Sequence, residues 1–247
     1  MPEREEQNCR NFVQAFGAVC ISAEYQLAPD HPFPAAPKSA WDGLKWAAAN
    51  AKSFGADPLL GFVVGGSSAG SNLTAVLTHL ARDEQLSPPL TGQYLSVPIL
   101  LPPAVVPEKY KEFYLSHEQN KNAPVLPKAA MDMFLRAYKP DDHDPLYVPF
   151  NHPNGHAGLP PAYFQVAGMD MLRDESLIYE HVLREEYGIK TKLDMYPGLP
   201  HGFWTFFPML KSSDKFYVDM VKGMGWLLGR EPHMVKIKTA KAEEVVV

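Results

Sequence analysis

The most informative part of the sequence is Gly61-Phe-Val-Val-Gly-Gly-Ser-Ser-Ala-Gly70, which continues into Ser71-Asn-Leu-Thr-Ala-Val-Leu-Thr-His-Leu80. It predicts a short buried strand over 62–64, a glycine-rich turn, and a helix with an apolar face formed by Leu73, Val76, Leu77 and Leu80. The turn contains the pattern G-x-S-x-G, which presents its central serine, Ser68, above the edge of a sheet. Such a backbone is strained, so we expect Gly66 and Gly70 to be needed for their missing Cβ atoms. The turn therefore predicts a nucleophilic serine.

The helix that follows Ser68 predicts an environment for negative charge. The first N–H groups of a helix have no partner within it, and its dipole places a partial positive charge at the same end. The N–H of Ala69 is the one oxyanion donor that we assign within this chain.

Composition limits the function classes. A chain of 247 residues with 46% hydrophobic and 21% charged residues is typical of one sizeable soluble domain. A net charge of −5, without a basic cluster before the last dozen residues, argues against a nucleic-acid partner. Two cysteines, Cys9 and Cys20, predict neither a disulfide framework nor a metal site. The charged amino terminus and the lack of a long apolar run predict no signal peptide, no membrane span and a cytoplasmic location.

The first part of the chain alternates between helix and strand. We expect a helix over 5–16 with Phe12, Val13 and Phe16 inward, ended by Gly17. A continuous apolar run predicts a strand over 18–25 that is covered on both faces. A rigid proline-rich loop over 26–37, a helix over 40–51 that packs Trp41, Leu44 and Trp46, and a strand over 91–97 follow. This alternation predicts a parallel α/β sheet with right-handed crossovers.

The alternation stops between Pro98 and Pro160. This proline-punctuated segment predicts an inserted lid with a helix over 128–138. The apolar residues of that helix either line a substrate pocket or pack the insertion onto the sheet, and the sequence leaves both open: Met131, Met133, Phe134 and Leu135.

The alternation resumes with a strand over 161–167, a helix over 175–187, a strand over 192–196 and a final helix over 210–228. We therefore expect a single domain over 1–230 that includes the lid over 98–160, followed by a flexible tail over 231–247.

A nucleophilic serine needs an imidazole to take its proton and a carboxylate to orient that imidazole. In open α/β sheets such groups gather at the carboxyl ends of strands. Asp170 follows the strand over 161–167, and His201 follows the strand over 192–196. Asp174 and Glu175 are weaker candidates for the acid, because carboxylates are favoured at a helix start by capping alone.

The other histidines are expected to be surface or packing residues: His31, His79, His117, His143, His152, His156, His181 and His233. The order Ser68, Asp170, His201 is the one expected of an α/β-hydrolase.

Four motifs together identify a family. Tyr25-Gln-Leu-Ala-Pro-Asp-His-Pro-Phe-Pro-Ala-Ala36, Gly66–Gly70, Gly168-Met-Asp-Met-Leu-Arg-Asp-Glu175 and His201-Gly-Phe203 resemble the hormone-sensitive-lipase (family IV) group of α/β-hydrolases. The resemblance extends from about Cys9 to Leu228. It implies an α/β-hydrolase fold with a mostly parallel sheet flanked by helices and a cap. It also implies a carboxylesterase for small or medium acyl esters that uses Ser68, Asp170 and His201 and no cofactor.

The sequence departs from this family at the front. Gln26 stands where the family usually has Arg, and Ser67 where it often has an acidic residue. The family also carries a His-Gly-Gly-Gly run upstream, which supplies most of its oxyanion hole, and this sequence contains no such run. We expect that segment, with the first strands of the sheet, to be absent from this chain. The strands over 18–25 and 62–64 would then pair directly, leave a gap, or belong to a longer natural protein.

Two classes of function follow. The first is a serine ester hydrolase whose partner is a small-molecule ester and whose intermediate is an acyl-serine. The alternative is a truncated or degenerate non-catalytic homologue. A variant of the first is an ester-processing tailoring enzyme of a biosynthetic pathway.

Overall fold

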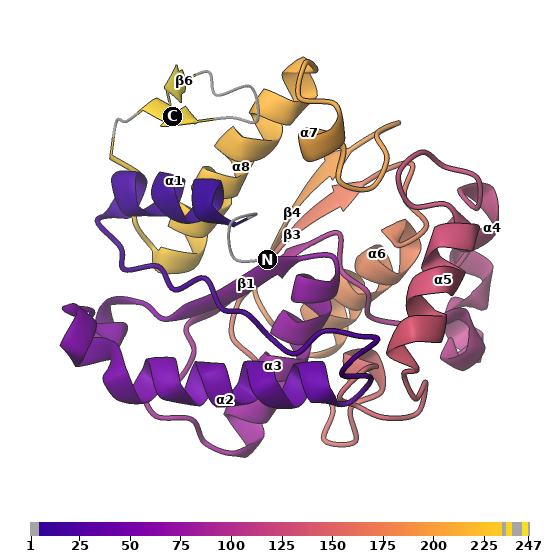
Figure 1. The fold of residues 1–247 in the computed structure, drawn as a ribbon, viewed down its shortest axis with the longest axis horizontal. Coiled ribbons are helices and arrows are strands. Elements are labelled where there is room, and N and C mark those ends of the chain that lie inside the picture. The colour runs from indigo at the N-terminus through magenta and orange to yellow at the C-terminus, as the bar shows by residue number, and fades with distance from the viewer. Residues whose placement is uncertain (1–4, 234–235, 239–243, 247) are drawn as a thin grey trace.

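A computed structural model of the protein describes residues 5–233, 236–238 and 244–246. Four parallel strands form its main sheet in the order β1-β2-β3-β4 (Figure 1). They are β1 (Val63–Ser67), β2 (Gly92–Ser96), β3 (Ala162–Ala167) and β4 (Thr191–Tyr196). Because neighbours in the sheet are also neighbours in sequence and run parallel, all four carboxyl ends meet at one edge.

Helices cover both faces of this sheet (Figure 1). On one face, α1 (Glu6–Phe16) and α8 (Lys211–Leu228) share an apolar cluster with Tyr94 and Tyr163. On the other face, α3 (Ala69–Asp83) and α6 (Arg173–His181) pack against Leu95 and Phe164. Successive side chains of a strand point to opposite faces, so β2 and β3 each contribute to both cores. All residues of these two inner strands are buried.

The helix α2 (Ala35–Asn50) packs against α3 through Trp41 and Leu44. It begins earlier than expected, inside the proline-rich stretch, because proline is tolerated in the first turn of a helix. The prediction that Trp46 packs inward is wrong, since 53% of this residue is exposed. The 3₁₀ turns η2 (Ala51–Phe54) and η3 (Pro58–Leu60) connect α2 to β1.

The expected strand over 18–25 does not form. Residues 17–27 adopt no regular structure, and Val19 and Ile21 are 46% and 47% exposed. Within the described residues, β1 pairs only with β2, so its other edge offers this segment no ladder. The apolar pattern here reflects a strand that needs neighbours on both sides, and without them the segment stays extended and half-exposed.

The helix at the amino terminus agrees with its prediction. The helix α1 ends at Phe16, and Gly17 adopts the left-handed conformation that closes a helix (φ 62°). Phe16 is buried as expected, but Val13 is 45% exposed, so the expectation that it faces inward is wrong.

The segment over 98–160 contains only short elements. They are η4 (Pro103–Val105), η5 (Glu108–Phe113), α4 (Ser116–Gln119), α5 (Lys128–Tyr138) and η6 (Pro149–Asn151). Met131 is buried against Leu126 and Leu172, and Leu135 packs beside them. Packing therefore accounts for these two side chains of α5, whereas Met133 and Phe134 are more than half exposed.

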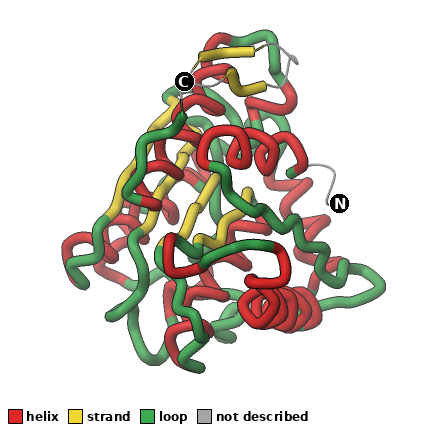
Figure 2. Tube along the Cα trace, turned by 90° about the vertical axis from the view of Figure 1, so that its left-hand side faces the viewer, coloured by secondary structure: helices red, strands yellow, loops and turns green. Residues whose placement is uncertain are grey.

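The last third of the chain follows the predicted order with small shifts. The helix α6 continues through a single π turn, η7 (Val182–Glu186), and α7 (Phe203–Phe206) precedes α8. In the expected tail, β5 (Lys236–Lys238) pairs antiparallel with β6 (Glu244–Val246), and Ile237 is buried. Figure 2 shows this pair at one end of the molecule, apart from the main sheet. The rest of the expected tail beyond His233 lies outside the described residues. No helix within the described ranges has the length and apolarity needed to cross a bilayer.

Candidate active site

Ser68 occupies the sharp turn between β1 and α3. It is a non-glycine residue in the positive-φ region, with φ 56° and ψ −116°, which is a strained conformation. A Cβ on Gly66 would lie 2.5 Å from the carbonyl carbon of Gly70, so only glycine fits there. The expectation for Gly70 is wrong: a Cβ at that position would meet no heavy atom within 4 Å. The turn thus depends on Gly66 and on the close passage of the Gly70 backbone.

Backbone and hydroxyl contacts hold the turn to the neighbouring strand. The N–H of Ser68 donates to the carbonyl of Ser96 at the end of β2, at 2.8 Å. The buried Ser71 hydroxyl accepts from the N–H of Ser96 at 2.7 Å and donates to the carbonyl of Gly66. These contacts fix the strained conformation from two sides. No sequence pattern marks Ser71 for this role.

The structure brings His201 and Asp170 to Ser68 from separate loops. His201 Nε2 lies 3.0 Å from Ser68 Oγ, and His201 Nδ1 lies 2.7 Å from Asp170 Oδ2. Asp170 is 2% exposed, and its other carboxylate oxygen accepts from the N–H of Leu172 at 3.1 Å. The two distances from His201, to Ser68 Oγ and to Asp170 Oδ2, are those of hydrogen bonds. One continuous chain of polar contacts therefore runs from the buried carboxylate to the serine hydroxyl.

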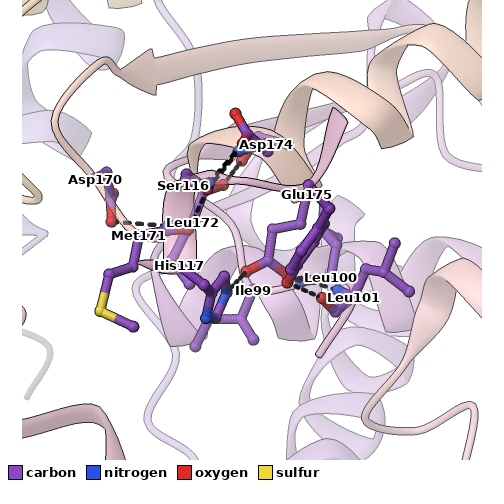
Figure 3. Close-up of polar contacts among 12 residues, drawn as sticks. Ile99, Leu100, Leu101, Ser116, His117, Asp170, Met171, Leu172, Asp174 and Glu175 are labelled. Atoms are coloured by element: carbon purple, nitrogen blue, oxygen red, sulfur yellow. Dashed lines mark hydrogen bonds and ion pairs between the residues drawn. The ribbon is translucent and has the colours of Figure 1, made fainter. Parts of the chain in front are cut away.

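The two rival carboxylates have other partners. Asp174 Oδ2 accepts from the N–H groups of Leu115 and Ser116, at 2.7 and 2.6 Å. Glu175 Oε2 accepts from the N–H groups of Leu100 and Leu101, both at 2.6 Å (Figure 3).

Burial raises the pKa of the Glu175 carboxyl, and the contact with His117 opposes that shift. Both rivals bind the segment over 98–160, whereas Asp170 contacts His201.

Three of the other histidines form a cluster away from Ser68, in which His79 and His156 are buried. His79 Nδ1 lies 2.7 Å from the carbonyl of Ala75, and its Nε2 lies 3.0 Å from His156 Nδ1. The ring of His152 stacks on that of His79 at 4.5 Å. These contacts agree with the expected packing role. Within the described residues, His201 is the one histidine bonded to Ser68.

The N–H of Ala69 begins α3 directly beside Ser68. No acceptor for this N–H lies within the described part of the chain. A free N–H at the start of a 15-residue helix stabilises a negatively charged oxygen. The arrangement can thus bind an oxyanion next to the serine. Among the described residues, no group of three or more His, Cys, Asp or Glu side chains has an arrangement that could hold a metal ion.

Comparison with known proteins gives consistent relatives. A profile of the alpha/beta hydrolase fold matches residues 1–205. An AB hydrolase superfamily protein of Schizosaccharomyces pombe is 44% identical over 213 residues, which cover 86% of this chain and 62% of that protein. The versiconal hemiacetal acetate esterase of Dothistroma septosporum is 36% identical over 223 residues, which cover 90% of this chain and 67% of the esterase.

Solved structures with a similar fold include a cyclase and an esterase. Vibralactone cyclase superposes with a TM-score of 0.79 at 44% identity, covering 83% of this chain and 60% of the cyclase. An esterase of Pyrobaculum calidifontis superposes with a TM-score of 0.79 at 31% identity, covering 91% of this chain and 72% of the esterase. The chain therefore spans about 60% of the length of the first of these relatives and of the cyclase.

Proposed function

Since the chain belongs to the α/β-hydrolase family, we propose that it is a serine carboxylic-ester hydrolase for small or medium acyl esters. One observation carries this proposal: His201 lies within hydrogen-bond distance of both Ser68 Oγ and Asp170 Oδ2. That arrangement meets the geometric requirement for an activated serine nucleophile. The esterases among the relatives support the choice of an ester as the substrate.

In the proposed reaction Ser68 Oγ attacks the carbonyl carbon of the ester while His201 Nε2 takes the hydroxyl proton. Asp170 accepts from His201 Nδ1–H, which keeps Nε2 free of a proton before the attack and stabilises the imidazolium after it. The C–O bond to the alcohol then breaks, and His201 returns the proton to the leaving oxygen. Water then attacks the acyl carbon while His201 Nε2 takes a proton from it. The bond from that carbon to Ser68 Oγ breaks, His201 returns the proton to Ser68 Oγ, and the acid is released.

The oxyanion of each tetrahedral intermediate accepts from the N–H of Ala69. Loss of one oxyanion donor lowers turnover by about 10²–10³-fold in other enzymes. Because the Ala69 N–H is the one oxyanion donor that we assign in this chain, we expect slow turnover compared with esterases that have a complete oxyanion hole.

A tailoring enzyme is a second candidate. Two relatives carry names from specialised chemistry, versiconal hemiacetal acetate esterase and vibralactone cyclase. In such an enzyme the same acyl-serine would be captured by a nucleophile other than water. Product analysis in the presence of an added alcohol separates the two, since capture by the alcohol yields a new ester instead of the acid.

Hydrolysis of a p-nitrophenyl ester series tests the proposal. We expect release of p-nitrophenol by the wild-type chain, at least tenfold less by Ser68→Ala, and wild-type rates for Ser67→Ala, which removes the neighbouring hydroxyl of the same turn. Folded wild-type protein that binds the ester without releasing p-nitrophenol would instead support the non-catalytic alternative.

A further inference from the structure

The loop that carries Asp170 is held in place by the segment over 98–160. Asn120 Nδ2 donates to the main-chain carbonyl of Asp170 at 2.9 Å. The Ser116 hydroxyl donates to the carbonyl of Met171 at 2.6 Å and accepts from the N–H of Asp174 at 3.1 Å. Ser116 begins α4 and Asn120 directly follows it, so one short helix makes all three contacts. The backbone from Asp170 to Asp174 is thereby fixed.

Side chains that follow Asp170 also bond residues in and beside α4. The Asp174 carboxylate accepts from the N–H groups of Leu115 and Ser116, and Arg173 bonds both Asp174 and Gln119 (Figure 3 shows the contacts with Ser116). Ser116 is fully buried and Asp174 is 6% exposed. Buried, charge-assisted hydrogen bonds of this kind are stronger than neutral ones, and they leave little freedom to the elements that they join.

The loop that carries Asp170 lies between β3 and α6, outside both elements. The strand β3 ends at Ala167, three residues before Asp170, and α6 begins at Arg173. The N–H groups of Gly168 and Met169 donate to the carbonyls of Tyr196, the last residue of β4, and of Leu199, at 2.9 Å each. Between Asp170 and Asp174, the main-chain groups bonded to a separate part of the chain are bonded by the side chains of Ser116 and Asn120.

We propose that Ser116 and Asn120 are positioning residues that act through Asp170 on His201. This inference rests on the proposed function, because it assigns Asp170 as the carboxylate that orients the imidazole. It also gives α4 a fixed place beside the catalytic groups, in a segment that the sequence predicts to be a lid. Among the described residues, neither side chain has a hydrogen bond to Ser68 or His201.

The consequence for His201 follows from its two ring nitrogens. While Asp170 accepts from Nδ1–H, Nε2 has a free lone pair for the serine proton. If the Asp170 loop shifts, the Nδ1 proton loses its acceptor and the tautomer with the proton on Nε2 becomes populated. That tautomer cannot take the Ser68 proton, so reactivity falls although all three side chains are still present.

Proton NMR of the imidazole N–H tests the proposal without requiring turnover. A proton held between His201 Nδ1 and Asp170 gives a strongly deshielded resonance that exchanges slowly, and its absence in His201→Gln assigns it. We expect this resonance in the wild type and in Glu118→Ala. The Glu118 side chain also lies on α4, but it is 80% exposed and pairs only with Lys121 among the described residues. We expect loss or exchange broadening of the resonance in Ser116→Ala and, independently, in Asn120→Ala.

The rate at which a fluorophosphonate labels Ser68 provides the second readout. We expect it to fall at least tenfold in both variants while the near-ultraviolet circular dichroism stays that of the wild type. Asn120 is only half-buried, so its variant keeps the test decisive if Ser116→Ala does not fold.

A wild-type resonance that persists unchanged in folded Asn120→Ala, or no wild-type resonance at all, would overturn the proposal. A wild-type resonance without any labelling would instead contradict the proposed hydrolase function, and the two failures are thus distinguishable.

Discussion

Acid should destabilise the fold through the buried pair His79 and His156. Burial lowers the pKa of His79 to about 3 and that of His156 to about 4, in both cases from an ordinary value of 6.5. The neighbouring positive charge of Arg82 contributes to both shifts. The folded state keeps both imidazoles neutral. Their contribution to the free energy of unfolding is therefore fully present above pH 6.5, and it is lost as the pH falls towards the pKa values of the folded state.

The geometry explains why protonation is unfavourable. His79 Nδ1 bonds the Ala75 carbonyl, so it carries the proton and Nε2 is the acceptor for His156 Nδ1–H. A proton added to His79 Nε2 would face the donor proton of His156 within a buried contact. A pH of about 5 lies about 1.5 units below the ordinary histidine pKa, and each unit corresponds to about 1.4 kcal/mol. Protonation in the unfolded chain therefore costs the folded state about 2 kcal/mol of stability for each histidine and about 4 kcal/mol for the pair.

Urea unfolding followed by tryptophan fluorescence at about pH 7.5 and about pH 5 measures this loss. We expect the free energy of unfolding to fall by about 4 kcal/mol in the wild type and by about 2 kcal/mol in His156→Gln, because the variant retains one of the two groups. The matched control His143→Gln removes an exposed histidine and should keep the wild-type dependence. Equal losses in the wild type and in His156→Gln would refute the reasoning.

Two further predictions concern the backbone of the site. Gly66→Ala should lower the free energy of unfolding by about 1–3 kcal/mol and abolish fluorophosphonate labelling, because its Cβ would collide with the Gly70 backbone, whereas Gly70→Ala should be tolerated. Thermal unfolding and labelling of both variants check this, and a tolerated Gly66→Ala would be inconsistent with the strained turn. Glu175→Ala should destabilise the protein by about 2–5 kcal/mol, since it leaves the buried N–H groups of Leu100 and Leu101 without an acceptor. Glu175→Gln keeps an acceptor oxygen and should retain most of the stability. Denaturant titration distinguishes the variants, and equal stabilities would speak against the role of this carboxylate.

Local patterns were sufficient for much of the fold. The strand β2, the strand β3 and the helix α3 each carry a complete signal in their own residues, and each forms within three residues of its predicted bounds. The turn at Ser68 was also predictable, because the glycine at Gly66 reports a local crowding of the backbone. Asp170 and His201 follow strands, and the sheet topology alone was sufficient to expect them near one another.

Features that depend on distant partners could not be predicted. The apolar run over 18–25 reads as a strand, but a strand exists only where a neighbour supplies a ladder, and no neighbour is provided on that side of β1. Ser116 and Asn120 contact the Asp170 loop across more than 45 residues of sequence, and no spacing or periodicity marks them. Likewise, a polar residue such as Asp174 could be assigned to helix capping but not to the N–H groups of Leu115 and Ser116.

The most direct measurement is the mass of the protein after reaction with a fluorophosphonate, followed by peptide mapping. If Ser68 is activated by His201 and Asp170, one phosphonyl group will be found on the peptide that contains Ser68. The adduct will be absent in Ser68→Ala and will form at least tenfold more slowly in His201→Gln. Folded wild-type protein that stays unmodified at Ser68, or that is modified at the same rate in His201→Gln, would contradict the proposed catalytic role of these three residues.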